Sequence, residues 1–232
     1  MVVRADYRDL LVLAMNPHTV SIRDMLFGDR PLAAWPSDTS NIDPRQPWAL
    51  FVNARNSMSA GDQASAVAAW QRVLSTPDLE SRHYLQAWYF LRSVGYEPPP
   101  SECKVLLGIV VEVAMPEGTD LLAAYADHTA RYYNFSGSGV VWDGPDTSLD
   151  VVIDHLLDAG RNVVTMIGPW EGERLPPPPH GELRLSFLTP SGLHFGQGAI
   201  DTMAADPLAG PVFHNAAVLM QQLIQKAESN TR

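Results

Sequence analysis

Residues 103–143 constrain the fold more than any other stretch, because apolar runs there are separated by short turn sequences. The breaks read Pro-Glu-Gly, Asp-His-Thr and Ser-Gly-Ser-Gly, all typical of tight connections between strands. We predict strands over 104–114, 121–126, 130–135 and 140–143, joined as a four-stranded antiparallel meander. Only Glu112 interrupts the apolar character of the first strand, which we expect at the centre of a sheet covered on both faces.

The chain beyond residue 143 continues this sheet and adds helices to it. Helical spacing predicts one helix over about 149–167, capped by Thr147 and Asp150 and passing through Gly160, although 162–167 could instead form a strand. Residues 169–180 are expected to form a loop with four consecutive prolines. The alternation in 183–187 predicts a strand with one wet face, returned by a turn at 189–192 to a strand at 193–197. A final helix is predicted from Pro211 to about residue 228.

The first hundred residues show helical periodicity. We expect a short helix at 5–15, an apolar patch at 22–28, and a surface loop at 29–47 that Trp35 pins to the body. Apolar spacing then predicts a helical hairpin, with helices at 48–59 and 63–74 around Ala-Gly-Asp. In a third helix, Thr76 would be the N-cap, Pro77 the first helical residue and Gly95 the C-terminal cap.

A proline-rich break divides the chain. Three consecutive prolines in 98–102 predict a stiff linker between a helical domain (1–97) and an α+β domain (103–228). The expected fold class is therefore α+β, with an N-terminal helical segment packed on a C-terminal antiparallel sheet that has flanking helices.

The helical hairpin at about 48–77 resembles a tetratricopeptide repeat. Ala54, Gly61, Ala66, Trp70 and Pro77 stand near the positions that this family fills with small, glycine, small, large and proline residues. The resemblance implies stacked helices that bind peptides. However, no second copy follows at the 34-residue period of the family, and one repeat alone makes no groove.

Charge and cysteine content limit the classes of partner. The formal net charge is −10, and residues 101–232 hold 16 acidic side chains against 7 Lys and Arg. Such a surface repels phosphate backbones and anionic lipid, so we expect no nucleic acid or membrane partner; a basic protein partner would suit it. Cys103 is the only cysteine, and Asp6 and Asp9 precede the first apolar run, so a reducing cytoplasmic location without a secretion signal is expected.

No familiar catalytic motif is present, and no cofactor or metal is expected. The seven histidines lack ligand spacing on one helix, and Asp150, Asp154 and Asp158 are typical of a solvated acidic face. Asp127 and His128 could form an acid/base pair beside Arg131, but turn chemistry accounts for both. Ser136 to Gly139 could cradle an anion, although a hairpin loop explains them more simply.

Aromatic residues are the best candidates for a binding surface. Tyr132 and Tyr133 should lie on opposite faces of one strand, and Trp142, Trp170 and His194 complete the candidate set. The leading hypothesis is a non-enzymatic cytoplasmic protein-interaction protein. The alternative is a small-molecule-binding or hydrolytic domain with a site near Asp127, His128, Arg131, Tyr133 and His194, and homodimerisation is compatible with both.

Overall fold

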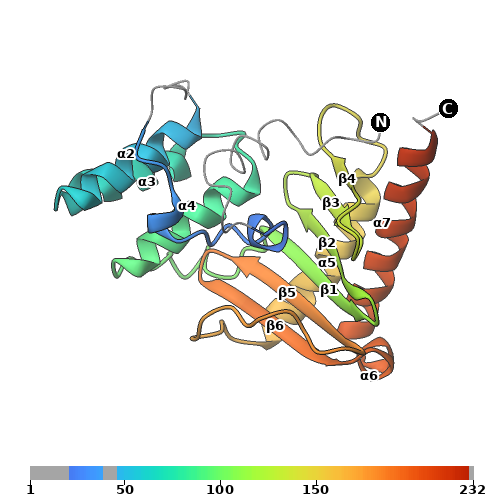
Figure 1. The fold of residues 1–232 in the computed structure, drawn as a ribbon. Coiled ribbons are helices and arrows are strands. Elements are labelled where there is room, and N and C mark those ends of the chain that lie inside the picture. The colour runs from blue at the N-terminus through green and yellow to red at the C-terminus, as the bar shows by residue number, and fades with distance from the viewer. Residues whose placement is uncertain (1–20, 39–45, 230–232) are drawn as a thin grey trace.

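The computed structural model of the chain describes residues 21–38 and 46–229 (Figure 1). The predicted helix at 5–15 lies outside these residues. The helices are α2 (Pro47–Ser59), α3 (Gln63–Ser75), α4 (Ser81–Ser93), α5 (Asp150–Met166), α6 (Ile200–Ala205) and α7 (Ala209–Ser229), with short 3-10 turns at Arg23–Met25 and Leu32–Ala34. The strands are β1 (Gly108–Met115), β2 (Gly118–Tyr125), β3 (Ala130–Tyr133), β4 (Gly139–Trp142), β5 (Glu182–Thr189) and β6 (Gly192–Ala199). The predicted α+β class is confirmed.

The six strands form one antiparallel sheet in the order β4-β3-β2-β1-β5-β6. The predicted meander is therefore confirmed as four consecutive neighbours, and β1 lies at the centre as expected. On its other side β1 pairs with β5, which places Ile109 opposite Phe187. The first strand begins at Gly108, later than predicted, because residues 100–104 form turns in which the Cys103 amide donates to the Pro99 carbonyl.

Helices α5 and α7 cover one face of the sheet. Buried residues of β1, β2 and β5 pack against them, among them Ile109, Leu122 and Leu185. The single helix through Gly160 is confirmed, and a β-carbon there would lie 2.5 Å from Ile109 Cδ1, so glycine lets α5 approach the sheet closely.

The predicted Thr147 cap is wrong, because α5 begins at Asp150 with Leu149 at the N-cap. Helix α6 was not predicted, and α7 begins two residues before Pro211.

The opposite face is covered by three segments that are remote from one another in sequence. Residues 21–29, Leu85 of α4 and the loop 169–180 lie over it. Glu112 is fully buried on this face, where Arg23 Nε donates to it at 2.6 Å and Arg184 Nη1 lies 3.5 Å away. The predicted wet face of 183–187 is wrong: Arg184 and Ser186 are buried, since the loop carbonyls of Leu175 and Pro176 close over Arg184.

The helical hairpin and α4 form a further core beside the sheet. Both predicted hairpin helices are confirmed, and Trp35 is 5% exposed against Phe51 and Phe90, so it pins its loop as expected. The predicted start of the third helix is wrong. Thr76 caps the end of α3 and Asp78 has a φ of 57°, so the chain turns there before α4 begins at Ser81.

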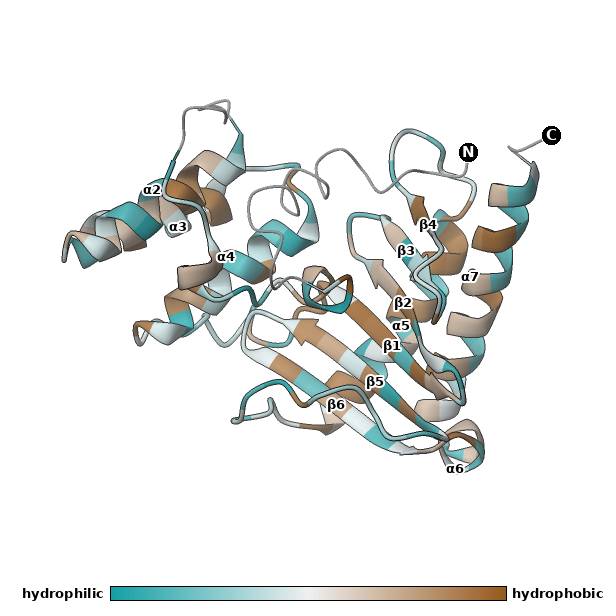
Figure 2. Ribbon diagram, viewed as in Figure 1, coloured by the Kyte–Doolittle hydropathy of each residue, from teal (hydrophilic) through white to brown (hydrophobic). Residues whose placement is uncertain are grey.

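Hydropathy follows the layers of the fold. Figure 2 shows hydrophobic residues concentrated along β1, whereas hydrophobic and polar positions alternate along α3 and α7. None of the described helices is both long enough and apolar enough to cross a lipid bilayer. Helix α4 joins the helical layer to the sheet, because Phe90 packs with the hairpin and Leu85 with the sheet.

Candidate functional site

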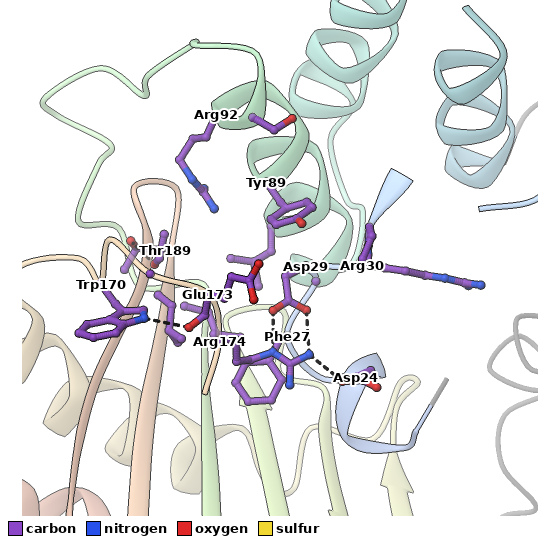
Figure 3. A pocket seen from close by; sticks show the side chains of 18 of the residues that line it. Asp24, Phe27, Asp29, Arg30, Tyr89, Arg92, Trp170, Glu173, Arg174 and Thr189 are labelled. Atoms are coloured by element: carbon purple, nitrogen blue, oxygen red, sulfur yellow. Dashed lines mark hydrogen bonds and ion pairs between the residues drawn. The ribbon is translucent and has the colours of Figure 1, made fainter. Parts of the chain in front are cut away.

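A cleft of about 1070 Å³ lies where α4 meets the sheet (Figure 3). Its walls come from residues 24–34, the second half of α4, the loop 170–174 and the turn between β5 and β6. Small-molecule pockets typically measure roughly 300–1,000 Å³, so this cleft is slightly larger than that range. The lining combines apolar side chains with charges of both signs.

Helix α4 supplies one wall through residues at helical spacing. Leu85, Tyr89 and Arg92 are four and three residues apart, which places them on one face of the helix. Leu85 lies against Gly28, whose φ is 63°, and a β-carbon at that glycine would come within 2.7 Å of Leu85 Cβ. Glycine therefore lets residues 24–34 pass directly beside the helix.

The opposite wall is held by a charge cluster around Arg174. Its guanidinium donates to Asp29 and Asp24, each at 2.7 Å, and lies 4.2 Å from the centre of the Phe27 ring. Burial opposes the ionisation of Asp24, but the hydrogen bonds from Arg174 and Ser21 outweigh it and lower the Asp24 pKa. The two carboxylates neutralise Arg174 and leave one excess negative charge, and their bonds to it fix this wall.

The loop and the β5–β6 turn form the mouth of the cleft. The Trp170 amide donates to the Leu193 carbonyl at 2.6 Å, and the indole packs edge-to-face against the Phe195 ring. The indole remains 45% exposed, and its Nε1 donates to the Glu173 carbonyl. Thr189 Oγ1 donates to the Gly192 carbonyl and lies 2.9 Å from Ser191 Oγ, so the hydroxyls of this turn bond within it.

Arg92 differs from Arg174 because no carboxylate of the described residues pairs with it. Its Nη1 donates to the Pro190 carbonyl, and burial lowers its pKa. Burial, followed by the nearby charge of Asp29, raises the pKa of Tyr89, so its hydroxyl stays protonated at neutral pH. On the loop, Glu171 and Glu173 are exposed, and neither carboxylate forms an ion pair within the described chain. Arg92, Glu171 and Glu173 are therefore cleft charges without an ion-pair partner among the described residues, as is Arg30, whose guanidinium donates to the Ala34 carbonyl.

The predicted group at the β2–β3 turn has structural contacts and does not line the cleft. Asp127 accepts from the Ser81 amide at 2.6 Å and from the Thr129 hydroxyl at 2.7 Å. His128, with a φ of 61°, contacts Asp154 at 3.0 Å instead of pairing with Asp127. Arg131 is buried near Glu80 and the Tyr125 ring. The turn chemistry is confirmed, whereas catalysis at these residues stays a prediction.

The other predicted binding residues are dispersed over the molecule, and only Trp170 lines the cleft. Tyr132 and Tyr133 lie on opposite faces as expected: Tyr132 donates to Asp120, and Tyr133 is buried beneath residues 21–29. Trp142 packs at the edge of the α5–α7 core, with Lys226 Nζ 5.5 Å from its ring. His194 is fully buried, and burial lowers its pKa, which favours the neutral ring.

The remaining candidate sites can be assigned from their contacts. The backbone amides of Ser136 and Ser138 donate hydrogen bonds to Asn134 Oδ1, so the segment between β3 and β4 is a hairpin loop, as expected. Asp154 contacts His128 and Asp158 pairs with Arg161 on the same helix. Within residues 21–38 and 46–229, no three histidine, cysteine or carboxylate side chains gather closely enough to hold a metal ion.

Apart from Trp170, the cleft residues were not among the predicted site residues, and those missed include Asp29, Tyr89, Arg92, Glu173 and Arg174. The spacing of Leu85, Tyr89 and Arg92 was readable as one helical face, but nothing local shows that this face borders a cleft. Comparison with known proteins adds no assignment: no protein-family model, curated protein or solved structure matches the chain.

Proposed function

We propose that the protein is a non-enzymatic, cytoplasmic interaction protein that holds a segment of a partner protein in the cleft beside α4. The main support is Arg92 on one wall and Glu171 and Glu173 on the other, which no described residue neutralises. The cleft lining also includes Phe27, Leu188, Leu193 and the exposed Trp170. Apolar side chains together with opposite charges suit a polypeptide, whose side chains vary in character along its length.

Binding fits the cleft better than catalysis does. The described lining residues include no histidine, cysteine or lysine, the usual sources of a base or nucleophile at neutral pH. Asp24 and Asp29 are held by Arg174, and the Thr189 hydroxyl donates to a backbone carbonyl. The formal net charge of −10 favours a partner that carries basic residues.

The repeat-like hairpin has a part in this proposal as the support of α4. Ala54 and Ala66 are fully buried, and Trp70 stacks on Phe90 of α4 with ring centroids 5.2 Å apart. The inner surface of the hairpin therefore positions the helix that carries Tyr89 and Arg92. The resemblance to tetratricopeptide repeats supports an interaction role only in this indirect way.

A bulky residue in the cleft tests the proposal, and the chain offers a matched control. Ser93 and Ser75 are exposed last residues of α4 and α3, and each hydroxyl bonds the carbonyl three residues earlier. Ser93 lines the cleft and Ser75 does not. A partner captured by the unmodified protein should be lost with Ser93→Trp and retained with Ser75→Trp. A capture that Ser93→Trp leaves intact contradicts the assignment of the cleft.

A small organic acid is the second candidate ligand, favoured by Arg92 in a cleft of this volume. A thermal-shift screen of carboxylic acids separates the two candidates. Stabilisation by one acid that disappears in Ser93→Trp, together with protein capture unaffected by that variant, would favour the small ligand.

A further inference from the structure

The three arginines that line the cleft are used differently. Arg174 is neutralised by Asp24 and Asp29. Arg30 donates to the Ala34 carbonyl and lies over the Trp35 ring, and Figure 3 shows its side chain directed away from the others. Arg92 points into the cleft in the same view. It is the cation that a ligand can reach.

Two polar groups on α4 remain available at this point. Arg92 uses Nη1 for the Pro190 carbonyl, which leaves Nε and Nη2 without a hydrogen-bond acceptor among the described residues. A β-carbon at Gly192 would lie 3.8 Å from both nitrogens, so the guanidinium adjoins bare backbone. Tyr89 Oη forms no hydrogen bond within the described chain, and Tyr89 and Arg92, three residues apart on α4, both line the cleft in Figure 3.

We infer that Tyr89 and Arg92 bind a carboxylate of the partner segment, while Glu171 and Glu173 bind a basic side chain beside it. This inference rests on the proposed function and fixes the direction in which the segment lies. Guanidinium donors match a carboxylate in geometry and charge, and a phenol adds a third donor. The carboxylate is an Asp or Glu side chain or the C-terminus of the partner.

Phosphate is the other common ligand of arginine, and the cleft disfavours it. A phosphate monoester carries a charge of about −1.5 to −2 at neutral pH. Asp29, Glu171 and Glu173 line the same cleft, and Asp29 and Glu173 lie near enough to raise the Tyr89 pKa. A second negative charge on the ligand is repelled by these carboxylates, whereas a carboxylate with a basic neighbour matches both walls.

Arg92 also fastens α4 to the β5–β6 turn, so a test needs a variant that leaves this bond intact. Tyr89→Phe removes a hydroxyl that makes no hydrogen bond within the described chain. Tyr84→Phe is the matched control, because the Tyr84 hydroxyl donates to the Thr76 carbonyl and accepts from the Leu79 amide, outside the cleft. A binding role predicts that Tyr89→Phe weakens binding without lowering the melting temperature. Tyr84→Phe should lower the melting temperature and leave binding unchanged.

The probe is an array of random dodecapeptides, each printed with a free and an amidated C-terminus and, at serine positions, with and without phosphate. Bound peptides should be enriched in an acidic residue or free terminus next to Lys or Arg. We expect Arg92→Gln to weaken their binding about tenfold or more and Tyr89→Phe several-fold, as for loss of charge-assisted and neutral hydrogen bonds.

The outcomes separate the two proposals. Peptides lost with Ser93→Trp but bound equally by Arg92→Gln and Tyr89→Phe would overturn the carboxylate site and leave the docking cleft in place. A preference for phosphoserine over Asp or Glu would also overturn it. If no peptide binds, or Ser93→Trp changes nothing, the proposed function fails and the inference with it.

Discussion

Ser81 and Asp127 exchange two hydrogen bonds across the junction between α4 and the β2–β3 turn: the Ser81 amide donates to Asp127 Oδ2 at 2.6 Å, and the Asp127 amide donates to Ser81 Oγ at 3.2 Å. At the other end of α4, Arg92 donates to the Pro190 carbonyl. The helix is thus fixed to the sheet at both ends, and the cleft wall keeps its place between these two points.

Asp127→Ala should lower the free energy of unfolding by about 2 kcal/mol or more, because it removes the cap of α4 and the brace of its own turn. Asp62→Ala is the control, since Asp62 caps α3 only locally by accepting from the Ser65 amide, and a smaller loss is expected there. Urea unfolding measures both. A loss from Asp127→Ala no larger than that from Asp62→Ala would contradict the bracing role.

Glu80 should make the junction sensitive to acid. Burial opposes its ionisation, but the charges of Arg82, His83 and Arg131 outweigh this and hold the Glu80 pKa at about 2, below the ordinary 4.5. The ionised form is therefore favoured by folding: its contribution is complete above pH 4.5 and is lost as the pH falls toward 2. A shift of this size corresponds to on the order of 3 kcal/mol.

Glu80→Gln tests this dependence. The stability difference between the unmodified protein and the variant should be greatest near neutral pH and shrink below pH 4.5, as measured by urea unfolding across pH. A difference that stays constant down to pH 3 is not compatible with a pKa near 2.

Arg23→Met should cost about 3 kcal/mol or more, because Glu112 is fully buried and loses its closest cation. Residues 21–29 should also become more accessible to protease, since Arg23 ties them to the sheet and to the Leu175 carbonyl. Arg161→Met is the control: its pair with Asp158 is exposed, and a change of about 0.5 kcal/mol or less is expected. Equal effects of the two variants would contradict a clamp at Arg23.

Gly160→Ala should destabilise the fold by about 1–3 kcal/mol despite the better helix propensity of alanine. Its β-carbon would lie 2.5 Å from Ile109 Cδ1 and 3.0 Å from Leu106 Cδ2, so these packed side chains or α5 itself would have to shift. Gly168→Ala is the comparison, because a β-carbon added there would meet no described atom within 4 Å, and little change is expected. Thermal unfolding measures whether Gly160→Ala raises or lowers the melting temperature. A higher melting temperature would show that the space between α5 and the sheet can hold a methyl group.

Local periodicity was sufficient for the helical hairpin, for α5 and for the meander, although it missed α6 and the start of α4. The spacing of Trp70 and its apolar neighbours predicted the hairpin, and the turn at His128 joined β2 to β3 as expected. These elements depend on contacts between residues that are close in the chain, which a sequence pattern records directly.

Contacts between remote segments were beyond such patterns. The alternation around Arg184 is typical of a strand with one solvent-exposed face. A loop nevertheless covers the polar face, because the backbone carbonyls of the loop accept hydrogen bonds from the guanidinium. The pairing of β1 with β5 crosses more than sixty residues, and the cleft is assembled from four separate segments. No property of Tyr89 or Arg92 alone in the sequence distinguishes them from other half-buried helical residues.

The covering of the sheet by residues 21–29 also orders events during synthesis on the ribosome. Arg23 emerges early, but its acceptors, Glu112 and the Leu175 carbonyl, follow 89 and 152 residues later. Helices α2 to α4 can therefore form before their neighbouring strands exist, whereas the cleft closes only once the β5–β6 turn has left the exit tunnel. On the proposed function, a nascent or truncated chain that ends before this turn would lack the docking cleft, and the partner would not bind it.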